Sequence, residues 1–399
     1  MTGSVQLSLE QSRPLHIDPV VRRLQGERCI HRIRTALGAE GWLVTGYREV
    51  RQLLEDPRLG RSHPDPENAA RSGESAMLGN LLGNYETERA DSKRMRGLLL
   101  PQMSPRRMRE LRPRIEEITT ELIDGILDGD LSASDTEPVR KADLQQALAF
   151  PLPVSVICEL LGVPLSDRQR YLEWTYAAAL QSDRVRSEQG LADLHTYGRE
   201  LAAAKRRAPA DDVISRLCAI EGVDDAEVAT LSMTLLFAGE AAIMALGIGT
   251  VILLQNPDQA EALRQDPQLI PGAVEEILRS LDKGGDGIIR YARADVEVDG
   301  LTIRAGDLVL LDTGAANHDS TIFAEPDAFD IQRAANSHLA FGHGTYYCVG
   351  TALARIELQV AFEQIITRFP KLRLAVPAEE LRLDREIVAG GLVELPVTW

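Results

Sequence analysis

The chain has 399 residues, of which 44% are hydrophobic and 26% are charged, a composition typical of a folded, water-soluble protein. Asp and Glu number 60 against 44 Lys and Arg, and the resulting net charge of −16 disfavours binding to nucleic acid. The four cysteines lack the spacing of a disulfide framework or a Cys-x-x-Cys zinc site, and the amino terminus has no apolar signal core. We therefore expect a cytoplasmic protein.

Helical periodicity dominates the sequence as far as residue 280. The apolar spacing predicts helices over 107–127, after Pro164, after Asp211 and over 266–280. Residues 231–254 form an apolar run whose one charge is Glu240, and this run is long enough to span a bilayer. No basic cluster flanks it, so we expect the buried central helix of a soluble protein and no membrane attachment.

Strand signals gather in the last third of the chain. Alternating valines before the turn Asp299-Gly300 predict a hairpin over 296–303. The run 306–312 is expected to pair nearby, and 386–399 to form a second hairpin with Gly390-Gly391 at its tip. With no repeat and no Pro/Gly/Ser-rich linker, the sequence predicts one mainly α domain over 1–399 with a minor β region.

One segment, FGHGTYYCVGTALAR from Phe341 to Arg355, carries candidate chemistry. Its glycines allow close backbone approach, and Cys348 precedes a run of helical periodicity. A cysteine at a helix amino terminus is stabilised as a thiolate by the helix dipole and free N–H groups. Such a thiolate is a ligand for a soft or redox-active metal, whereas a buried inert thiol is the alternative for a lone cysteine.

The spacing of Phe341, Gly344, Cys348 and Gly350 resembles the haem-ligand signature of the cytochromes P-450. The resemblance extends over about the whole chain and is greatest to the soluble actinobacterial class that tailors antibiotics and other secondary metabolites. It implies a triangular, mostly α fold that holds haem b between the central helix and the helix after the Cys loop. In that fold Cys348 is the axial iron ligand. The haem contacts that it implies are Ser92, Arg96, Ala238, Gly239, Arg290, Phe341, Gly342, Tyr346, Cys348 and Gly350.

Several charged residues also take roles from this resemblance. Arg96 and Arg290 resemble the arginines that pair with the haem propionates, which suits the bidentate guanidinium. Glu276, Arg279 and Arg333 resemble a buried ion network with a structural role.

The chain departs from the family pattern on the central helix. An acid and an alcohol usually stand where this chain has Ala241 and Ala242, and that pair relays protons during oxygen activation. Alanine has no proton to donate. Glu240 lies one residue before the usual acid position, about 100° around the helix. Its carboxylate is a displaced proton donor, a partner for a basic group of the substrate, or a group that faces solvent or a neighbouring helix.

Two further departures lie near the expected propionates. Tyr346 stands where His or Arg is usual, and its hydroxyl could still donate to a propionate. Ser92 stands where His is usual, as a weaker neutral donor. We expect both changes to leave haem binding intact and to alter the reduction potential modestly.

The resemblance implies a substrate site above the haem. The expected contacts are Leu81, Leu82, Asn84, Ala238, Glu240, Ala242, Ile288, Ile289, Val388 and Leu392. The basic run 105–114 is a solvated helix face or a docking surface for an acidic ferredoxin. The expected partners are a small-molecule substrate and a ferredoxin with its NADPH- or NADH-dependent reductase, and the chain is expected to be a monomer.

Three functions remain open at this point. The first is oxidative carbon–carbon or carbon–nitrogen coupling of an aromatic or indole, diketopiperazine-like substrate that assists its own proton delivery. The second is conventional hydroxylation or epoxidation of a polyketide, terpenoid or peptide intermediate. The third, favoured only by Ala241 and Ala242, is a non-catalytic haem-binding sensor or carrier.

Overall fold

The computed structural model describes residues 5–7, 15, 17–75, 84–129, 140–281, 287–334, 336–384, 386–388 and 390–399, without the side chains at 237, 238 and 240. Its α-helices are α1 (Pro19–Glu27), α2 (Tyr47–Glu55), α3 (Glu88–Leu99), α4 (Pro105–Leu127), α5 (Pro151–Leu161), α6 (Arg168–Ala179), α7 (Arg184–Arg207), α8 (Val213–Cys218), α9 (Asp225–Gln255), α10 (Pro257–Gln265), α11 (Ile270–Ser280), α12 (Thr313–Asn317) and α13 (Thr351–Arg368). Its strands are β1 (Val5–Gln6), β2 (Ile30–Arg34), β3 (Glu40–Val44), β4 (Leu59–Gly60), β5 (Lys141–Asp143), β6 (Ile288–Ala292), β7 (Val296–Val298), β8 (Leu301–Ile303), β9 (Leu308–Leu311), β10 (Arg373–Leu374) and β11 (Pro396–Thr398).

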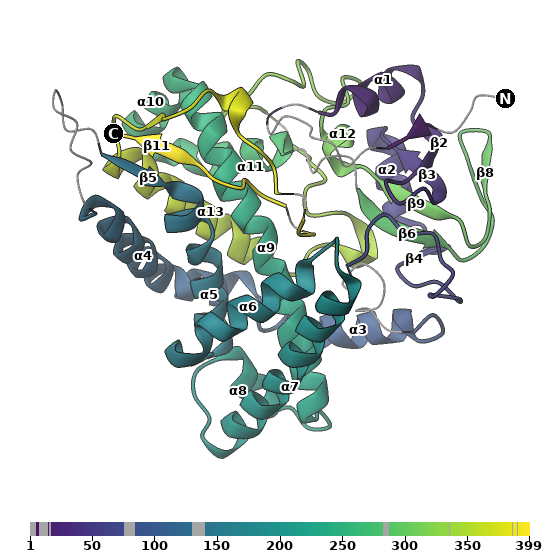
Figure 1. The fold of residues 1–399 in the computed structure, drawn as a ribbon, viewed down its shortest axis with the longest axis horizontal. Helices are drawn as coiled ribbons and strands as arrows, with labels where there is room; N and C mark the ends of the chain where they lie inside the picture. Colours follow the sequence, from purple (N-terminus) through teal and green to yellow (C-terminus); the bar gives the residue numbers. More distant parts are fainter. Residues whose placement is uncertain are drawn as a thin grey trace.

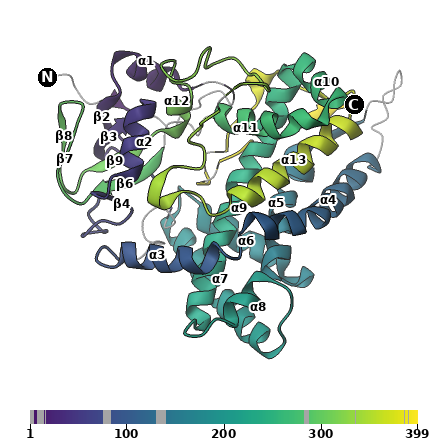
Figure 2. The same ribbon diagram turned by 180° about the vertical axis from the view of Figure 1, so that it is seen from behind.

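The sheet and the helices occupy different sides of the molecule. The larger sheet, in the order β1-β2-β3-β9-β6-β4, lies beside α1 and α2, and most of the longer helices lie on the other side (Figures 1 and 2). The predicted mainly helical fold with a minor β region is confirmed. The helices predicted over 107–127 and 266–280 correspond to α4 and α11.

The predicted hairpin over 296–303 is present as β7 and β8. Its turn residues Asp299 and Gly300 have φ of 49° and 69°, the left-handed values that a two-residue hairpin turn requires. The run 306–312 forms β9, which pairs with β3 and β6 and not with this hairpin.

The predicted second hairpin over 386–399 is only partly right. Leu392 forms an antiparallel bridge with Leu383, and Asp384 N–H donates to the Gly391 carbonyl at 2.8 Å. The regular terminal strand β11, however, pairs with β10 and β5. The terminal segment therefore divides between a short loop and a separate three-stranded sheet.

Helix α9 runs through the middle of the helical side (Figure 1). The side chain of Asp224 caps its first turn by accepting from Glu227 N–H at 2.8 Å. By length and composition α9 could cross a membrane, but 87% of its apolar window is buried inside the protein, against α5, α7, α11 and α13. The apolar run is therefore the buried central helix that the sequence predicted.

Candidate functional site

The loop before α13 holds Cys348 in a fixed backbone environment. Cys348 N–H donates to the Phe341 carbonyl at 3.0 Å, and Gly350 N–H donates to Cys348 Sγ at 3.3 Å. Gly344 has φ of 68°, and a Cβ there would come within 2.8 Å of Glu55 Cγ, so only glycine fits. A backbone donor aimed at sulfur from the start of a helix favours the thiolate.

Cys348 lines a cavity of about 420 Å³. The α9 residues that face it are Ala241, Ala242, Met244 and Ala245. Its polar lining comes from elsewhere in the chain, at Arg61, Arg290, His343, Tyr346 and Cys348. The predicted contacts Phe341, Gly342, Gly350, Ile288 and Ile289 also line it. The structure therefore brings the Cys loop, the central helix and β6 together around one space.

One end of this cavity is strongly cationic. Arg290 is 5% exposed, and its Nη1 donates to the Ile289 carbonyl at 2.8 Å. Burial, together with the nearby charge of Arg61, lowers the pKa of Arg290 to about 9. Neither arginine forms an ion pair with any residue that the structure describes. An uncompensated cationic end favours an anionic ligand.

A neighbouring cavity of about 240 Å³ shares Arg61 and Tyr346 with the first and is also lined by Ser92. Ser92 Oγ is buried and finds no hydrogen-bond partner within the described part of the chain. A thiolate, a largely apolar wall, unpaired guanidinium groups and an unsatisfied buried hydroxyl together suit haem, a flat apolar group with two carboxylates.

Two predicted haem contacts are placed differently from the expectation. The Tyr346 hydroxyl donates to Glu88 Oε1 at 2.6 Å, and its service to a propionate stays a prediction. Glu88 is 1% exposed, so the Tyr346 hydroxyl donates its hydrogen bond to a buried carboxylate. Arg96 donates to the Tyr347 carbonyl at 2.6 Å and is not among the residues that line the cavity.

Gly239 lies against α5 in this structure. A Cβ at Gly239 would approach Ile157 Cγ1 on α5 at 3.0 Å, and the residue lines a different, small apolar cavity with Ile157. Glycine at this point therefore allows α9 to pack closely against α5, and its contact with a porphyrin stays a prediction. The side chains of Ala238 and Glu240 lie outside the described part, so the alternatives for Glu240 stay predictions.

The predicted substrate contacts divide into two groups. Ile288, Ile289 and Ala242 line the cavity, whereas Leu81 and Leu82 lie outside the described residues. Asn84 is exposed, and its Oδ1 accepts from the backbone and hydroxyl of Thr87, both at 2.9 Å, just before α3. In this structure the Asn84 side chain caps a turn, and its role as a substrate contact stays a prediction.

Val388 and Leu392, two more predicted substrate contacts, lie against helices beside the site. Val388 N–H donates to the Ala179 carbonyl at 3.0 Å, and Leu392 is buried in the main core against Gly247 of α9. Neither residue is among those that line the two cavities that share Ile289. Both support the helices around the site and do not line it.

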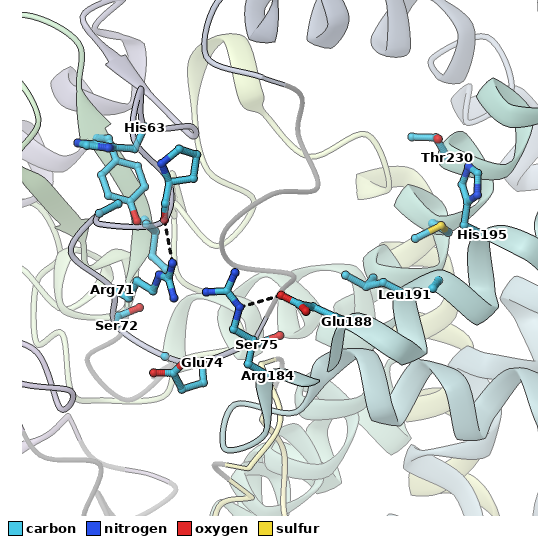
Figure 3. A pocket seen from close by; sticks show the side chains of 17 residues that line it. His63, Arg71, Ser72, Glu74, Ser75, Arg184, Glu188, Leu191, His195 and Thr230 are labelled. Carbon is cyan, nitrogen blue, oxygen red and sulfur yellow. Dashed lines mark hydrogen bonds and ion pairs between the residues drawn. The ribbon is translucent and has the colours of Figure 1, made fainter. Parts of the chain in front are cut away.

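A larger cavity of about 510 Å³ adjoins the first through Ile289, which lines both (Figure 3). It lies between the segment 63–75, β6, α7 and α9. Figure 3 shows His63, Arg71 and Glu74 on one side and the ion-paired Arg184 and Glu188 on the other. This larger, outer cavity has both acidic and basic side chains in its lining, whereas the α9 residues that line the inner cavity, the one with Cys348, are apolar.

The ion network predicted around Glu276 is joined by short hydrogen bonds to Arg279 and Arg333. Glu276 is fully buried, and its carboxylate accepts two bonds from Arg279, both at 2.8 Å. Arg333 Nε adds bonds of 3.0 and 3.1 Å to the same carboxylate. Arg279 and Arg333 also donate to backbone carbonyls in 317–328, so this network joins α11 to the segment before the Cys loop.

The basic run 105–114 is partly neutralised on its own helix. Arg106, Arg112 and Arg114 pair with glutamates three or four residues onward on α4. Arg107 and Arg109 form no ion pair within the described ranges. This surface is therefore less positive than its sequence indicates.

The sequence analysis missed Arg61 and Glu88. Arg61 follows β4 and enters the site because β4 pairs with β6, a contact between segments more than 200 residues apart. Glu88 is an acidic residue at the start of α3, where an exposed carboxylate is the ordinary expectation. No local motif marked either residue.

Comparison with known proteins agrees with this geometry. A profile of the Cytochrome P450 family matches residues 199–380. Pentalenolactone synthase of Streptomyces exfoliatus is 43% identical over 404 residues, which cover 99% of both chains. The mycinamicin IV hydroxylase/epoxidase of Micromonospora griseorubida is 38% identical over 94% of both chains. The solved structure of SgvP, a putative thioether synthase in the tailoring step of griseoviridin, has a TM-score of 0.89 at 35% identity, with both chains fully covered.

The chain belongs to the cytochrome P450 family and is a monooxygenase, an oxidoreductase. Membership implies a haem-thiolate cofactor, a small-molecule substrate and redox partners. It also decides against the alternative of a non-catalytic haem sensor or carrier.

Proposed function

We propose that this protein hydroxylates or epoxidises a bulky secondary metabolite, with haem b held by Cys348. The observation that carries the proposal is that Cys348 and the small residues Ala241 and Ala242 line one cavity from different elements. A thiolate supported by Gly350 N–H supplies the metal ligand, and the alanines leave room beside it. Arg290 supplies a buried charge for a haem carboxylate, whereas Arg96 on α3 donates to the Tyr347 carbonyl.

When bound, haem activates dioxygen with two electrons and two protons, so that one oxygen atom enters the substrate and the other leaves as water. The chain's own part is to position the substrate and to deliver protons. Ala241 and Ala242 present methyl groups to the cavity and cannot donate. We propose that protons come from ordered water or from a hydroxyl or N–H group of the substrate itself, with Glu240 as the alternative donor on α9.

The expected substrate is large and has both apolar and polar parts. The inner cavity offers Ile288 and Ile289 from β6, whereas the outer one offers His63, Arg71 and Glu74. A substrate that extends from one cavity into the other beside Ile289 would place an apolar carbon in the inner cavity and its polar groups in the outer cavity. Ile289→Trp, with Ile288→Trp as the matched neighbour, should block binding or change the position of oxidation, and unchanged products and affinity would remove Ile289 from the substrate site.

The reaction type follows from the relatives as a proposal. Mycinamicin IV hydroxylase/epoxidase carries both oxygen-insertion reactions in its name, and pentalenolactone synthase is named for the synthesis of pentalenolactone. No observation favours carbon–carbon or carbon–nitrogen coupling of an indole, so the proposal rests on oxygen insertion into a polyketide, terpenoid or peptide.

The electron supply completes the proposal. A ferredoxin and its NADPH- or NADH-dependent reductase in the bacterial cytoplasm would deliver electrons, with the exposed Arg109 and the half-buried Arg107 as the charges left for docking. The test is to screen polyketide, terpenoid and peptide metabolites for a Soret shift, and then to run turnover under ¹⁸O₂. One labelled oxygen atom in the product is expected. A dehydrogenated or coupled product without label would overturn oxygen insertion.

A further inference from the structure

Arg61 and Arg290 lie close to the same aromatic ring. Their guanidinium carbons stand 4.1 Å and 5.0 Å from the centre of the Tyr346 ring. Both arginines line the cavity that contains Cys348, and Arg61 also lines the neighbouring cavity that contains Ser92. Arg61 therefore stands where the two spaces meet.

The sheet brings the two arginines together. Strand β4 pairs antiparallel with β6, with Leu59 opposite Ala292 and Gly60 opposite Tyr291. Continued by one residue, this register brings Arg61 level with Arg290. Like charges opposite each other on neighbouring strands are destabilising unless something compensates them. The nearby charge of Arg61 contributes to the lowered pKa of Arg290, and burial lowers the pKa of Arg61 itself.

The nearest acid, Glu88, forms no ion pair with either guanidinium group within the described residues. Glu88 accepts from Arg61 backbone N–H at 2.8 Å, from Ser62 N–H at 3.0 Å and from the Tyr346 hydroxyl at 2.6 Å. Its remaining ion pair is with Arg293, at 3.4 Å. Glu88 thus fixes the backbone of Arg61 and the ring beneath its guanidinium. Within the described residues, the guanidinium itself makes no hydrogen bond or ion pair.

We propose that Arg61 binds a haem propionate beside Arg290, and so takes the place of the donor that Ser92 and Tyr346 do not supply. The inference rests on the proposed haem cofactor. Two guanidinium groups at one end of the cavity match the two carboxylates of haem in charge and in hydrogen-bonding geometry. Glu88 and Tyr346 are positioning residues that hold Arg61 in place.

The test measures the haem-loaded protein without turnover. The purified ferric form of wild type, Arg61→Gln and Arg61→Lys is mixed with excess apomyoglobin, and the rate of haem loss is followed. Arg58→Gln is the matched control, because Arg58 lies at the other end of β4 but is exposed and paired with Asp56 at 2.6 Å. The ferric–ferrous midpoint potential of each protein is the second readout, and thermal unfolding checks that each variant is folded.

Arg61→Gln should lose haem faster by about tenfold or more, the factor expected for one charge-assisted hydrogen bond. Its midpoint potential should fall, because removing a nearby positive charge favours the ferric state. Arg61→Lys should keep the wild-type potential, and Arg58→Gln should change neither quantity. An Arg61→Gln variant that matches Arg58→Gln in both readouts would overturn the inference, as would faster haem loss with an unchanged potential. Wild-type protein that binds no haem would instead overturn the proposed function.

Discussion

Ala242 on α9 and Cys348 in the loop before α13 line the same cavity, and Ala242 offers that cavity a methyl group where a proton donor is usual in the family. Ala241 beside it has the same limitation. The described α9 wall of the cavity is therefore built from alanines and one methionine. Neither alanine can donate a proton, so the proposed function assigns proton delivery to water or to the substrate.

This dependence predicts the behaviour of a restored acid–alcohol pair. Ala241→Asp with Ala242→Thr should add little to product formed per NADPH consumed, because the substrate side already supplies the protons. The added carboxylate is also costly to bury. Ala241→Asp with Ala242→Val is the control, since Val matches Thr in volume but has no hydroxyl. A several-fold gain with Thr over Val would show that the lost hydroxyl matters and would contradict substrate-assisted delivery.

The two arginines first assigned to the propionates should differ in effect. Arg290 is 5% exposed and lines the cavity, whereas Arg96 donates to the Tyr347 carbonyl outside it. Arg290→Gln should lower haem occupancy after purification far more than Arg96→Gln, because one partner of a buried charge pair is worth about 3–5 kcal/mol. The measurement is the ratio of Soret to protein absorbance. Equal occupancy in the two variants would remove the special role of Arg290.

The ion network around Glu276 should contribute more to the free energy of unfolding than the neighbouring, more exposed ion pair of Glu275. Glu276→Gln leaves the buried Arg279 and its neighbour Arg333 without a counter-charge, so the free energy of unfolding should fall by about 3–5 kcal/mol. Glu275→Gln, whose carboxylate is 26% exposed and pairs with Arg355, should cost less. Urea unfolding of both variants decides the matter. A smaller loss for Glu276→Gln than for Glu275→Gln would show that the network is not structural.

Glu357 predicts a pH dependence of stability. It is 2% exposed, one oxygen has no hydrogen-bond partner among the described residues, and burial raises its pKa from 4.5 to about 8. Between these values the native state binds one proton that the unfolded state has lost. Stability therefore falls with rising pH by about 1.4 kcal/mol per pH unit from this group. The contribution of Glu357 to the free energy of unfolding is fully present only below pH 4.5, and it is lost as the pH rises toward 8.

Glu357→Gln should remove that slope between pH 5 and pH 8. Glu363→Gln, on the same helix but with a side chain that is 43% exposed, should leave the slope unchanged. The measurement is the free energy of unfolding at several pH values. Parallel curves for wild type and Glu357→Gln would mean that the buried carboxyl does not retain its proton.

The candidate-site residues that the sequence analysis grouped together, and that line one cavity, belong to one short segment. Phe341, Gly342, Cys348 and Gly350 stand within ten residues, so their spacing alone indicated a shared loop. The helix and strand types likewise followed from local periodicity and from the turn at Asp299-Gly300.

The contacts that the sequence analysis did not predict have long-range causes. Helix α9 is apolar on all faces, so periodicity could not show that Gly239 points to Ile157 on α5. The hydroxyl of Tyr346 is taken by Glu88, 258 residues earlier in the chain. The place of Arg61 beside Arg290 depends on the register of β4 against β6. Each of these contacts joins segments that are far apart in the chain, so no local sequence pattern indicates it.

The central claim is that Cys348 is the thiolate ligand of a bound haem, and the spectrum of the reduced carbon monoxide complex tests it most directly. Wild type and Cys29→Ser, in which the other half-buried cysteine is changed, should both show the red-shifted Soret band of a thiolate-ligated haem. Cys348→Ser should lose that band. A thiolate spectrum that persists in Cys348→Ser would contradict the account.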